Sequence, residues 1–244
     1  MRRTRLYLPV PLQIGQTLQL NPPQTHYALN VLRLKNQHPI EIFDGQGKQA
    51  QGKLLITGRR TAEIQIETVE SINRESPLKT ILLQGISKGD RMDLTLQKSV
   101  ELGISEIQPL FTQRCEVKLK GEKLNKRLQH WQGILQSACE QCGRNQLPRL
   151  HPPTSWTEYQ NRPTPLNGLL LDPKAQHNFK SLPNSLTEKP IYLFIGPEGG
   201  LTEQERQQAQ AKGLTAIRIG QRILRTETAA PAILAALQAR WGDF

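Results

Sequence analysis

The sequence predicts a small β-rich domain over residues 1–72 and an α/β domain with a mostly parallel sheet over residues 73–244. Three observations support this division. Short strand patterns fill the first seventy residues, a polar proline-containing linker occupies residues 71–77, and apolar strand runs then alternate with helical patterns. A chain of 244 residues is long enough to bury sizeable cores without a metal or disulfide.

The first domain is predicted to be a small β-barrel with one helix. Its strands are expected over residues 6–8, 40–43, 53–56 and 62–69. Asp44-Gly45 follows the second of these strands and is typical of a hairpin turn, because both residue types tolerate positive φ. Residues 25–34 predict the helix, since Tyr27 or Ala28 and Val31 or Leu32 share a face at helical spacing.

The second domain alternates buried strands with amphipathic helices. Its strands are expected over residues 78–84, 107–111, 169–171, 191–195 and 216–219, and its helices over 91–102, 124–142 and a closing segment to Trp241. Continuous apolar strand runs are typical of parallel strands that are covered on both faces. Met92, Leu96 and Val100 form the apolar stripe of the first helix.

The composition favours a polyanionic partner inside the cell. Lys and Arg number 32 against 21 Asp and Glu, a net charge of +11. A merely basic, soluble surface is the alternative. Three cysteines form no disulfide framework, no secretory signal or membrane-length apolar run is apparent, and neither histidines nor cysteines show metal-ligand spacing. The sequence therefore predicts a cytoplasmic protein with no membrane segment and no metal.

Two glycine-containing loops follow predicted strands. In residues 194–205 a strand ends at Gly196, Gly199 and Gly200 follow, and Thr202 and Glu205 predict a capping box that starts a helix. The spacing matches neither a phosphate loop nor a dinucleotide fingerprint. The segment indicates a ligand at the carboxyl end of a strand or, equally, a tight structural turn.

The second loop, residues 217–231, again runs from a strand through a glycine to a helix. Pro231 suits a first helical turn, so the helix is expected to start within residues 226–230. Arg222, Arg225 and Glu227 place three charges at the carboxyl edge of the sheet. Arg225 and Glu227 could simply pair at the surface, but two such loops in one half-domain favour a shared binding cleft.

These segments resemble the RsmE-type family of 16S ribosomal RNA (uracil-N3) methyltransferases, within the SPOUT superfamily. The most specific motif is Arg-Thr-Glu-Thr-Ala at residues 225–229, and Gly-Pro-Glu-Gly-Gly at 196–200 supports it. The match extends to residues 87–103, 138–144 and 26–33, and so covers essentially the whole chain. Ile219 and Gln221 stand where leucine and proline are common in the family.

The resemblance implies a PUA-like N-terminal barrel for RNA, a C-terminal SPOUT domain with a deep trefoil knot, bound S-adenosylmethionine and a homodimer. Arg225 is the expected catalytic residue, stabilising negative charge on the uracil oxygens. Glu227 is expected to accept the N3 proton or orient the base that does, although capping of the helix is an alternative role. The expected cofactor-binding residues are Leu171, Gly196, Glu198, Gly199, Gly200, Ile219, Gly220, Leu224, Thr226 and Ala229.

The expected RNA contacts are basic side chains that would bind phosphates. Those chosen are Arg3, Arg5, Arg33, Lys88, Arg114 and Lys118, with Arg2, Arg59, Arg60, Lys120, Lys123, Lys126 and Arg127 in the same two basic regions. The substrate is expected to be free small-subunit ribosomal RNA or the assembled subunit. A catalytically silent ribosome- or RNA-binding module, or a methyltransferase acting on another RNA, are the alternatives.

Overall fold

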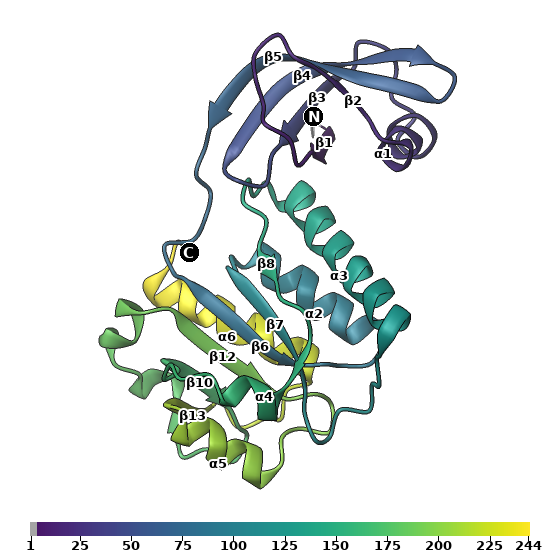
Figure 1. Ribbon diagram of the computed structural model, residues 1–244. Helices are drawn as coiled ribbons and strands as arrows, with labels where there is room; N and C mark the ends of the chain where they lie inside the picture. Colours follow the sequence, from purple (N-terminus) through teal and green to yellow (C-terminus); the bar gives the residue numbers. More distant parts are fainter. Residues whose placement is uncertain (1–3) are drawn as a thin grey trace. The chain divides into compact units, whose positions relative to one another are not determined.

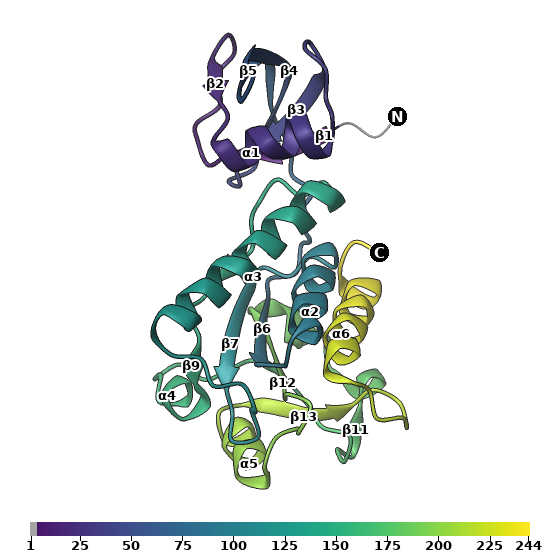
Figure 2. The same cartoon turned by 90° about the vertical axis from the view of Figure 1, so that its right-hand side faces the viewer.

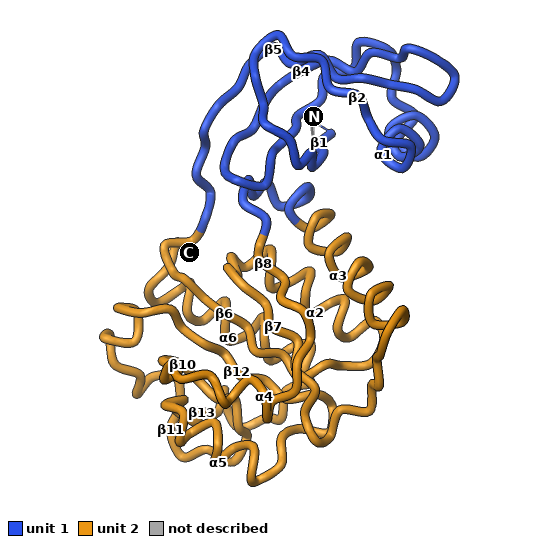
Figure 3. Tube along the Cα trace, viewed as in Figure 1, with its two compact units in different colours: residues 1–75, 139–147 blue, residues 76–138, 148–244 orange. Residues whose placement is uncertain are grey.

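The computed structural model describes residues 4–244, so the expected RNA contacts of Arg2 and Arg3 lie outside the described residues. The chain divides into two compact units (Figure 3). The first holds the chain up to Glu75 together with Cys139–Leu147, and the second holds Ser76–Ala138 and Pro148–Phe244. The first segment ends close to the expected boundary, but residues 139–147 were assigned to the second domain by the sequence and belong here to the first unit.

A five-stranded sheet forms the first unit (Figure 1). Its strands are β1 (Thr4–Tyr7), β2 (Thr17–Gln19), β3 (Pro39–Phe43), β4 (Lys48–Gly58) and β5 (Thr61–Ser71), in the order β1-β3-β4-β5-β2. β1 pairs with β3 in parallel and the other pairs are antiparallel. The hairpin after Asp44 is confirmed. Alternate residues such as Ile40 and Ile42, or Ile64 and Ile66, point into one core because side chains alternate across a strand.

The helical segment of this unit begins earlier than predicted. Helix α1 (Pro22–His26) starts at the N-cap Asn21, whose side chain forms a capping box with Gln24, and the π-helix η1 (Tyr27–Val31) continues it. The Asn-Pro-Pro-Gln pattern is itself a helix-start signal, since proline is tolerated in a first turn. Ala28 is fully buried, whereas Tyr27, Val31 and Leu32 are exposed.

Residues 139–147 are held in the first unit by buried polar contacts with its N-terminal strand. Arg5 donates from Nη1 to the carbonyl oxygen of Cys139 at 2.6 Å, from Nε to Glu41 at 2.7 Å, and from Nη2 to Asn145. The side chain of Glu140 accepts a hydrogen bond from the backbone N–H of Tyr7 at 3.0 Å. Burial raises the pKa of the Glu140 carboxyl. Most of the motif at residues 138–144, from Cys139 onward, therefore completes the first unit.

An eight-stranded sheet forms the core of the second unit, and its pairings are all parallel, where the sequence predicted a mostly parallel sheet. The order is β11-β13-β10-β12-β6-β7-β8, with β9 also paired to β7. The strands are β6 (Thr80–Gly85), β7 (Glu106–Phe111), β8 (Arg149–Leu150), β9 (Thr154–Ser155), β10 (Gly168–Leu171), β11 (His177–Asn178), β12 (Ile191–Ile195) and β13 (Leu214–Arg218).

Helices cover both faces of this sheet (Figures 1 and 2). They are α2 (Asp90–Glu101), α3 (Gly121–Cys142, which crosses the unit boundary), α4 (Trp156–Gln160), α5 (Glu203–Ala211) and α6 (Thr226–Trp241), with 3-10 turns η2 (Phe179–Ser181) and η3 (Asn184–Glu188). On one face α4 and α5 pack over the strands, with Trp156 stacked on Phe194 at 4.5 Å between ring centroids. On the other face α2 and α6 pack together. The predicted stripe of α2 is confirmed as buried. Among residues 4–244, no helix has the length and apolar character needed to cross a membrane.

Candidate functional site

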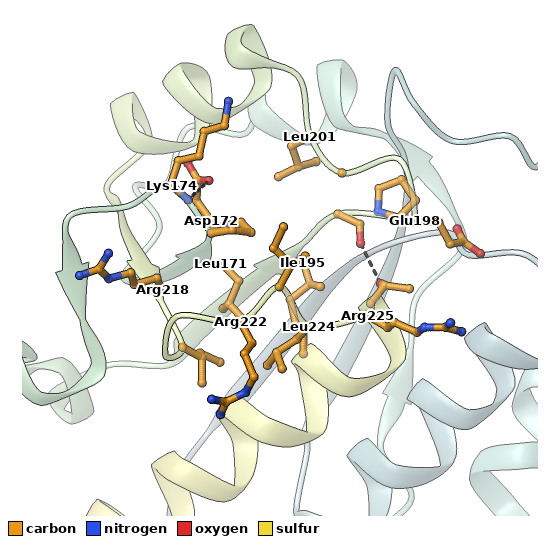
Figure 4. A pocket seen from close by; sticks show the side chains of 18 of the residues that line it. Leu171, Asp172, Lys174, Ile195, Glu198, Leu201, Arg218, Arg222, Leu224 and Arg225 are labelled. Atoms are coloured by element: carbon orange, nitrogen blue, oxygen red, sulfur yellow. Dashed lines mark hydrogen bonds between the residues drawn. The ribbon is translucent and has the colours of Figure 1, made fainter.

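A cavity of about 730 Å³ lies at the carboxyl ends of three neighbouring strands, β13, β10 and β12. Its walls are the segments that follow these strands, together with the start of α6 (Figure 4). Because parallel strands all end at the same sheet edge, segments far apart in the sequence meet here. The two glycine-containing loops therefore share one cavity, as the sequence predicts.

The loop after β12 supplies an apolar floor and exposed backbone. Ile195 and Leu201 are buried and line the cavity. Gly200 has a φ of +68°, a conformation that glycine adopts without strain. Thr202 then caps α5 through the predicted capping box with Glu205, which is confirmed. The loop thus turns sharply and leaves backbone groups facing the cavity.

The loop after β13 leads into α6, whose N-cap is Arg225 and whose first residue is Thr226. The buried Thr226 hydroxyl donates to the carbonyl oxygen of Gly196 at 2.8 Å and accepts from Gln84 Nε2 at 3.0 Å. This side chain ties the start of α6 to the ends of both β12 and β6. The helix starts within the expected range, but Pro231 lies in its interior and not in its first turn.

Charged side chains surround the entrance to the cavity. Glu227 Oε1 lies 3.9 Å from both Arg225 Nη1 and Arg91 Nε. The Glu227 side chain is only 13% exposed, whereas that of Arg225 is 77% exposed. Glu227 Oε2 is buried and has no hydrogen-bond partner among the described residues. A surface ion pair between Arg225 and Glu227 is present but long, so it leaves one carboxylate oxygen available for other chemistry.

The structure brings together nearly all residues that the sequence assigned to the cofactor site and to catalysis. Arg225 and Glu227 line the cavity, as do nine of the ten expected cofactor residues: Leu171, Gly196, Glu198, Gly200, Ile219, Gly220, Leu224, Thr226 and Ala229. Gly199 does not line it. Its carbonyl oxygen accepts a hydrogen bond from Arg114 Nη1 at 3.1 Å. Contact of these residues with a cofactor stays a prediction.

The expected RNA-binding residues have different environments. Arg33, Lys88, Arg114 and Lys118 are exposed, and Arg114 also lines the cavity. Lys88 Nζ forms an ion pair with Glu116 at 3.4 Å. The assignment of Arg5 is corrected: its side chain is 7% exposed, and each of its guanidinium nitrogens donates within the first unit. Arg5 therefore has a structural role.

Several cavity residues were not chosen from the sequence. Asp172 directly follows β10 and is paired with Arg206 at 3.5 Å, and Arg91 comes from the start of α2. Arg218 is the last residue of β13, and Arg222, noted in the sequence as a charge at this sheet edge but given no role, lies on the loop that follows. Within residues 4–244, neither side chain forms an ion pair or a hydrogen bond. The position of Asp172 and Arg218 at strand carboxyl ends is a signal that could have identified them. Nothing in the local sequence places Arg91 at the site.

Cys139 is buried and has the features of a structural thiol. Burial raises the pKa of the Cys139 thiol to about 12, which keeps it protonated and unreactive. Among residues 4–244, no three histidine, cysteine, aspartate or glutamate side chains are grouped to hold a metal ion.

Comparison with known proteins identifies relatives over the full chain. Residues 74–238 match a family model for an RNA methyltransferase domain, and residues 20–67 match one for an RNA methyltransferase PUA domain. A ribosomal RNA small subunit methyltransferase E from Buchnera aphidicola (Schizaphis graminum strain) is 37% identical over 99% of this chain and 98% of its own. The methyltransferase E of Bacillus subtilis is 28% identical over 89% of this chain and 88% of its own.

Solved structures give the same result. A ribosomal RNA small subunit methyltransferase E from Neisseria gonorrhoeae, crystallised with S-adenosyl methionine, is 42% identical, with a TM-score of 0.91 and full coverage of both chains. A Legionella pneumophila protein described as a methyltransferase, in complex with the cofactor SAM, is 38% identical with a TM-score of 0.94, again over both complete chains.

The PUA unit, the parallel sheet and the cavity at its carboxyl edge together define the class of two-unit RNA methyltransferases. Within that class, the chain belongs to the ribosomal RNA small subunit methyltransferase E family. The resemblance drawn from the sequence motifs is thereby confirmed.

Proposed function

We propose that this protein transfers a methyl group from S-adenosylmethionine to N3 of a uridine in 16S ribosomal RNA. The observation that carries the proposal is the cavity at the β10–β12–β13 edge, which gathers the motif residues of both glycine-containing loops. The proposal also draws on the relatives, which are methyltransferases of the small-subunit ribosomal RNA by name.

The cavity suits a cofactor of this size and chemistry. Its volume of about 730 Å³ falls within the roughly 300–1,000 Å³ of small-molecule pockets. Leu171, Ile195 and Leu201 offer apolar surface, and glycines at 196, 200 and 220 let a ligand approach the backbone closely. We assign these residues to the cofactor. When bound, S-adenosylmethionine supplies an electrophilic methyl group on its sulfonium.

The chain's own residues would prepare the uridine. N3 of uracil carries an imide proton and becomes a good nucleophile only when that proton leaves, which places negative charge on O2 and O4. Arg225 is an exposed cation at the cavity and would stabilise this charge. Glu227 has a buried, unpartnered carboxylate oxygen and would accept the proton.

RNA would be held mainly through its phosphates. The side chains of Arg218 and Arg222 are exposed, line the cavity and form no ion pair or hydrogen bond with another described residue, so they are available to phosphates beside the target base. Arg218 projects from the end of β13, and Arg222 from the loop that also carries Arg225 (Figure 4). The target base would have to leave its stack to reach the cavity.

Three further features are part of the proposal. A homodimer is supported by Ile223, whose side chain is 82% exposed beside the cavity and would be covered by a second copy. A trefoil knot over the C-terminal loops is supported by two hydrogen bonds of Thr226, which follows β13. One reaches Gly196 at the end of β12, with β10 between, and the other reaches Gln84 in β6, with β10 and β12 between. Membership of the methyltransferase E family supports two more features: closure of the five-stranded sheet into a PUA-like barrel, and a cytoplasmic location. Light scattering of Ile223→Glu tests the dimer, and a crystal structure tracing residues 168–241 tests the knot.

The reaction is tested by incubating the protein with S-adenosylmethionine and small ribosomal subunits that lack the modification. The RNA is then digested to nucleosides, and mass spectrometry compares the product with 3-methyluridine and its isomers. A 3-methyluridine peak supports the proposal, and Arg225→Ala should lower turnover far more than cofactor affinity. Cofactor binding without a methylated nucleoside would point to another RNA or assembly state. Absence of both would favour a silent ribosome-binding module.

A further inference from the structure

The segment Ser87–Gly103 belongs to the motifs that led to the family, yet the proposed function gives it no role. Most of it forms α2, which begins at Asp90 after the loop that leaves β6. Arg91, in the first turn of α2, is brought to the cavity, although it comes from neither glycine-containing loop. Its contacts indicate what this segment contributes.

On one side, Arg91 binds the loop after β12. Its Nη1 donates to Glu198 Oε1 at 2.9 Å, and the backbone N–H of Lys88 donates to the same oxygen at 2.9 Å. The hydrogen bond to Glu198 raises the pKa of the Arg91 guanidinium. Burial works against ionisation of Glu198, but the hydrogen bonds from Lys88 and Arg91 outweigh it and the pKa of that carboxyl is lowered. Glu198 is thus a fixed anion that orients the guanidinium.

On the other side, Arg91 faces the start of α6. Its Nε lies 3.9 Å from Glu227 Oε1, the oxygen that Arg225 also faces at 3.9 Å. The second oxygen, Oε2, is buried and has no hydrogen-bond partner within residues 4–244. A buried carboxylate oxygen left unpaired is costly, which makes it a candidate for a functional group. Both cations therefore attract Oε1, whereas Oε2 is left without a partner.

We propose that Arg91 is a positioning residue for methyl transfer, which holds Glu227 through Oε1 and ties it to Glu198 so that Oε2 takes the uridine proton. This role rests on the proposed function. In the step, the N3–H bond breaks, an O–H bond forms at Oε2, and the electron pair stays on N3, shared with O2 and O4. The Glu198–Arg91–Glu227 arrangement joins the cofactor loop to the proton acceptor, so that both are held relative to one another.

The test compares Arg91→Met and Arg91→Lys with the parent protein, on the full chain and with small subunits that lack the modification. Lys98→Met is the matched control, because Lys98 lies on the same helix and pairs with Glu101 away from the cavity. We expect Arg91→Met to lower kcat by roughly 10- to 100-fold, as misplacement of a reacting group does, with Kd for S-adenosylmethionine changed by less than about threefold. Cofactor affinity should persist because Lys88 still holds Glu198. Arg91→Lys should recover part of kcat, and Lys98→Met should match the parent.

A double-mutant cycle separates positioning from a general structural effect. If Arg91 acts through Glu227, then Arg91→Met combined with Glu227→Gln should have a kcat within about twofold of Glu227→Gln alone, because the group that Arg91 positions is already lost. If the two losses in kcat multiply in the double variant, the positioning role of Arg91 is wrong. It is also wrong if Arg91→Met leaves kcat unchanged, or if the variant loses only cofactor affinity. Thermal melting of each variant checks folding, and Arg91→Lys carries the same cycle if Arg91→Met does not fold. A parent protein that methylates no RNA would overturn the proposed function itself, and this role with it.

Discussion

Replacement of Thr226 by valine isolates the hydroxyl that joins the start of α6 to the two neighbouring strand ends. Valine has the shape of threonine and keeps the β-branch, so helix propensity hardly changes. The change removes the donor to the Gly196 carbonyl, at 2.8 Å, and the acceptor for Gln84 Nε2, at 3.0 Å.

The expected cost follows from these two bonds, because a third, from Ser87 Oγ at 3.5 Å, is long and Ser87 Oγ keeps its contact with the carbonyl oxygen of Gly85. Gln84 Nε2 keeps its bond to the carbonyl oxygen of Gly85 at 2.9 Å, so the Gly196 carbonyl is the group that loses its side-chain partner. A net hydrogen bond contributes about 0.5–1.5 kcal/mol and an unpaired buried group costs about 1–3 kcal/mol, so Thr226→Val should lower the free energy of unfolding by roughly 1–3 kcal/mol. Because Gly196 and Thr226 both line the cavity, S-adenosylmethionine should also bind more weakly, and each 1.4 kcal/mol of binding free energy lost would raise its Kd about tenfold.

Urea unfolding followed by circular dichroism measures the stability, and titration calorimetry measures cofactor affinity. Thr228→Val is the matched control: the same substitution two residues further along the helix, at an exposed position, should stay within about 0.5 kcal/mol. Thr226→Ser keeps the hydroxyl and should retain most of the cofactor affinity. Equal stability of Thr226→Val and Thr228→Val would refute the reasoning, since it would mean that the buried hydroxyl contributes nothing.

Three further predictions concern other parts of the chain. Arg5→Met should lower the free energy of unfolding by about 3–5 kcal/mol, because it leaves buried partners uncompensated, while RNA affinity measured on the folded fraction stays unchanged; a selective loss of RNA binding would restore Arg5 as an RNA contact. Arg222→Met should reduce the slope of log K for RNA against log salt by about 1, and an unchanged slope would exclude a phosphate contact. The Glu140 pKa is raised in the folded protein by burial, so its ionisation removes stability as pH rises from the ordinary glutamate value through the raised one. Glu140→Gln keeps an acceptor for Tyr7 but cannot ionise, so it should be more stable than the parent at pH 8 but not at pH 4. Urea titrations of both proteins at the two pH values would show this difference.

Local signals in the sequence were sufficient for most elements of the fold. The Thr202 and Glu205 spacing predicted a capping box because both partners lie within one helical turn. The stripe of α2 predicted a buried face for the same reason. Helix α1 starts earlier than the periodicity of residues 25–34 predicts, because its N-cap signal at Asn21 lies outside that periodic stretch. Short strands such as β8 and β11, of two residues each, have no pattern of their own.

The candidate site was predictable as far as it follows strand ends. Gly196 and Gly220 come after buried strands, so sheet topology alone brings them together. Arg91 could not be found in this way, because its ion pairs are with residues more than a hundred positions away and no period connects them. The same limit explains why the sequence predicts an RNA contact, and not a structural role, for Arg5. A basic residue near a terminus suggests a solvated charge, and only the tertiary structure shows that Asn145 and Cys139 surround it.

The discontinuous first unit has a consequence for how this protein is made. Its N-terminal strand depends on residues as far along as Asn145, so a ribosome must add 70 residues after Glu75 (from 76 to 145) before Arg5 can meet all its partners. At roughly 5–20 residues per second, this takes on the order of 4 to 14 s. Domains usually complete their folding in the order of synthesis, but here the N-terminal unit has to wait until residues 76–138 of its neighbour have left the ribosome. A fragment that ends at Glu75 lacks the later segment and would therefore stay in this incompletely folded state.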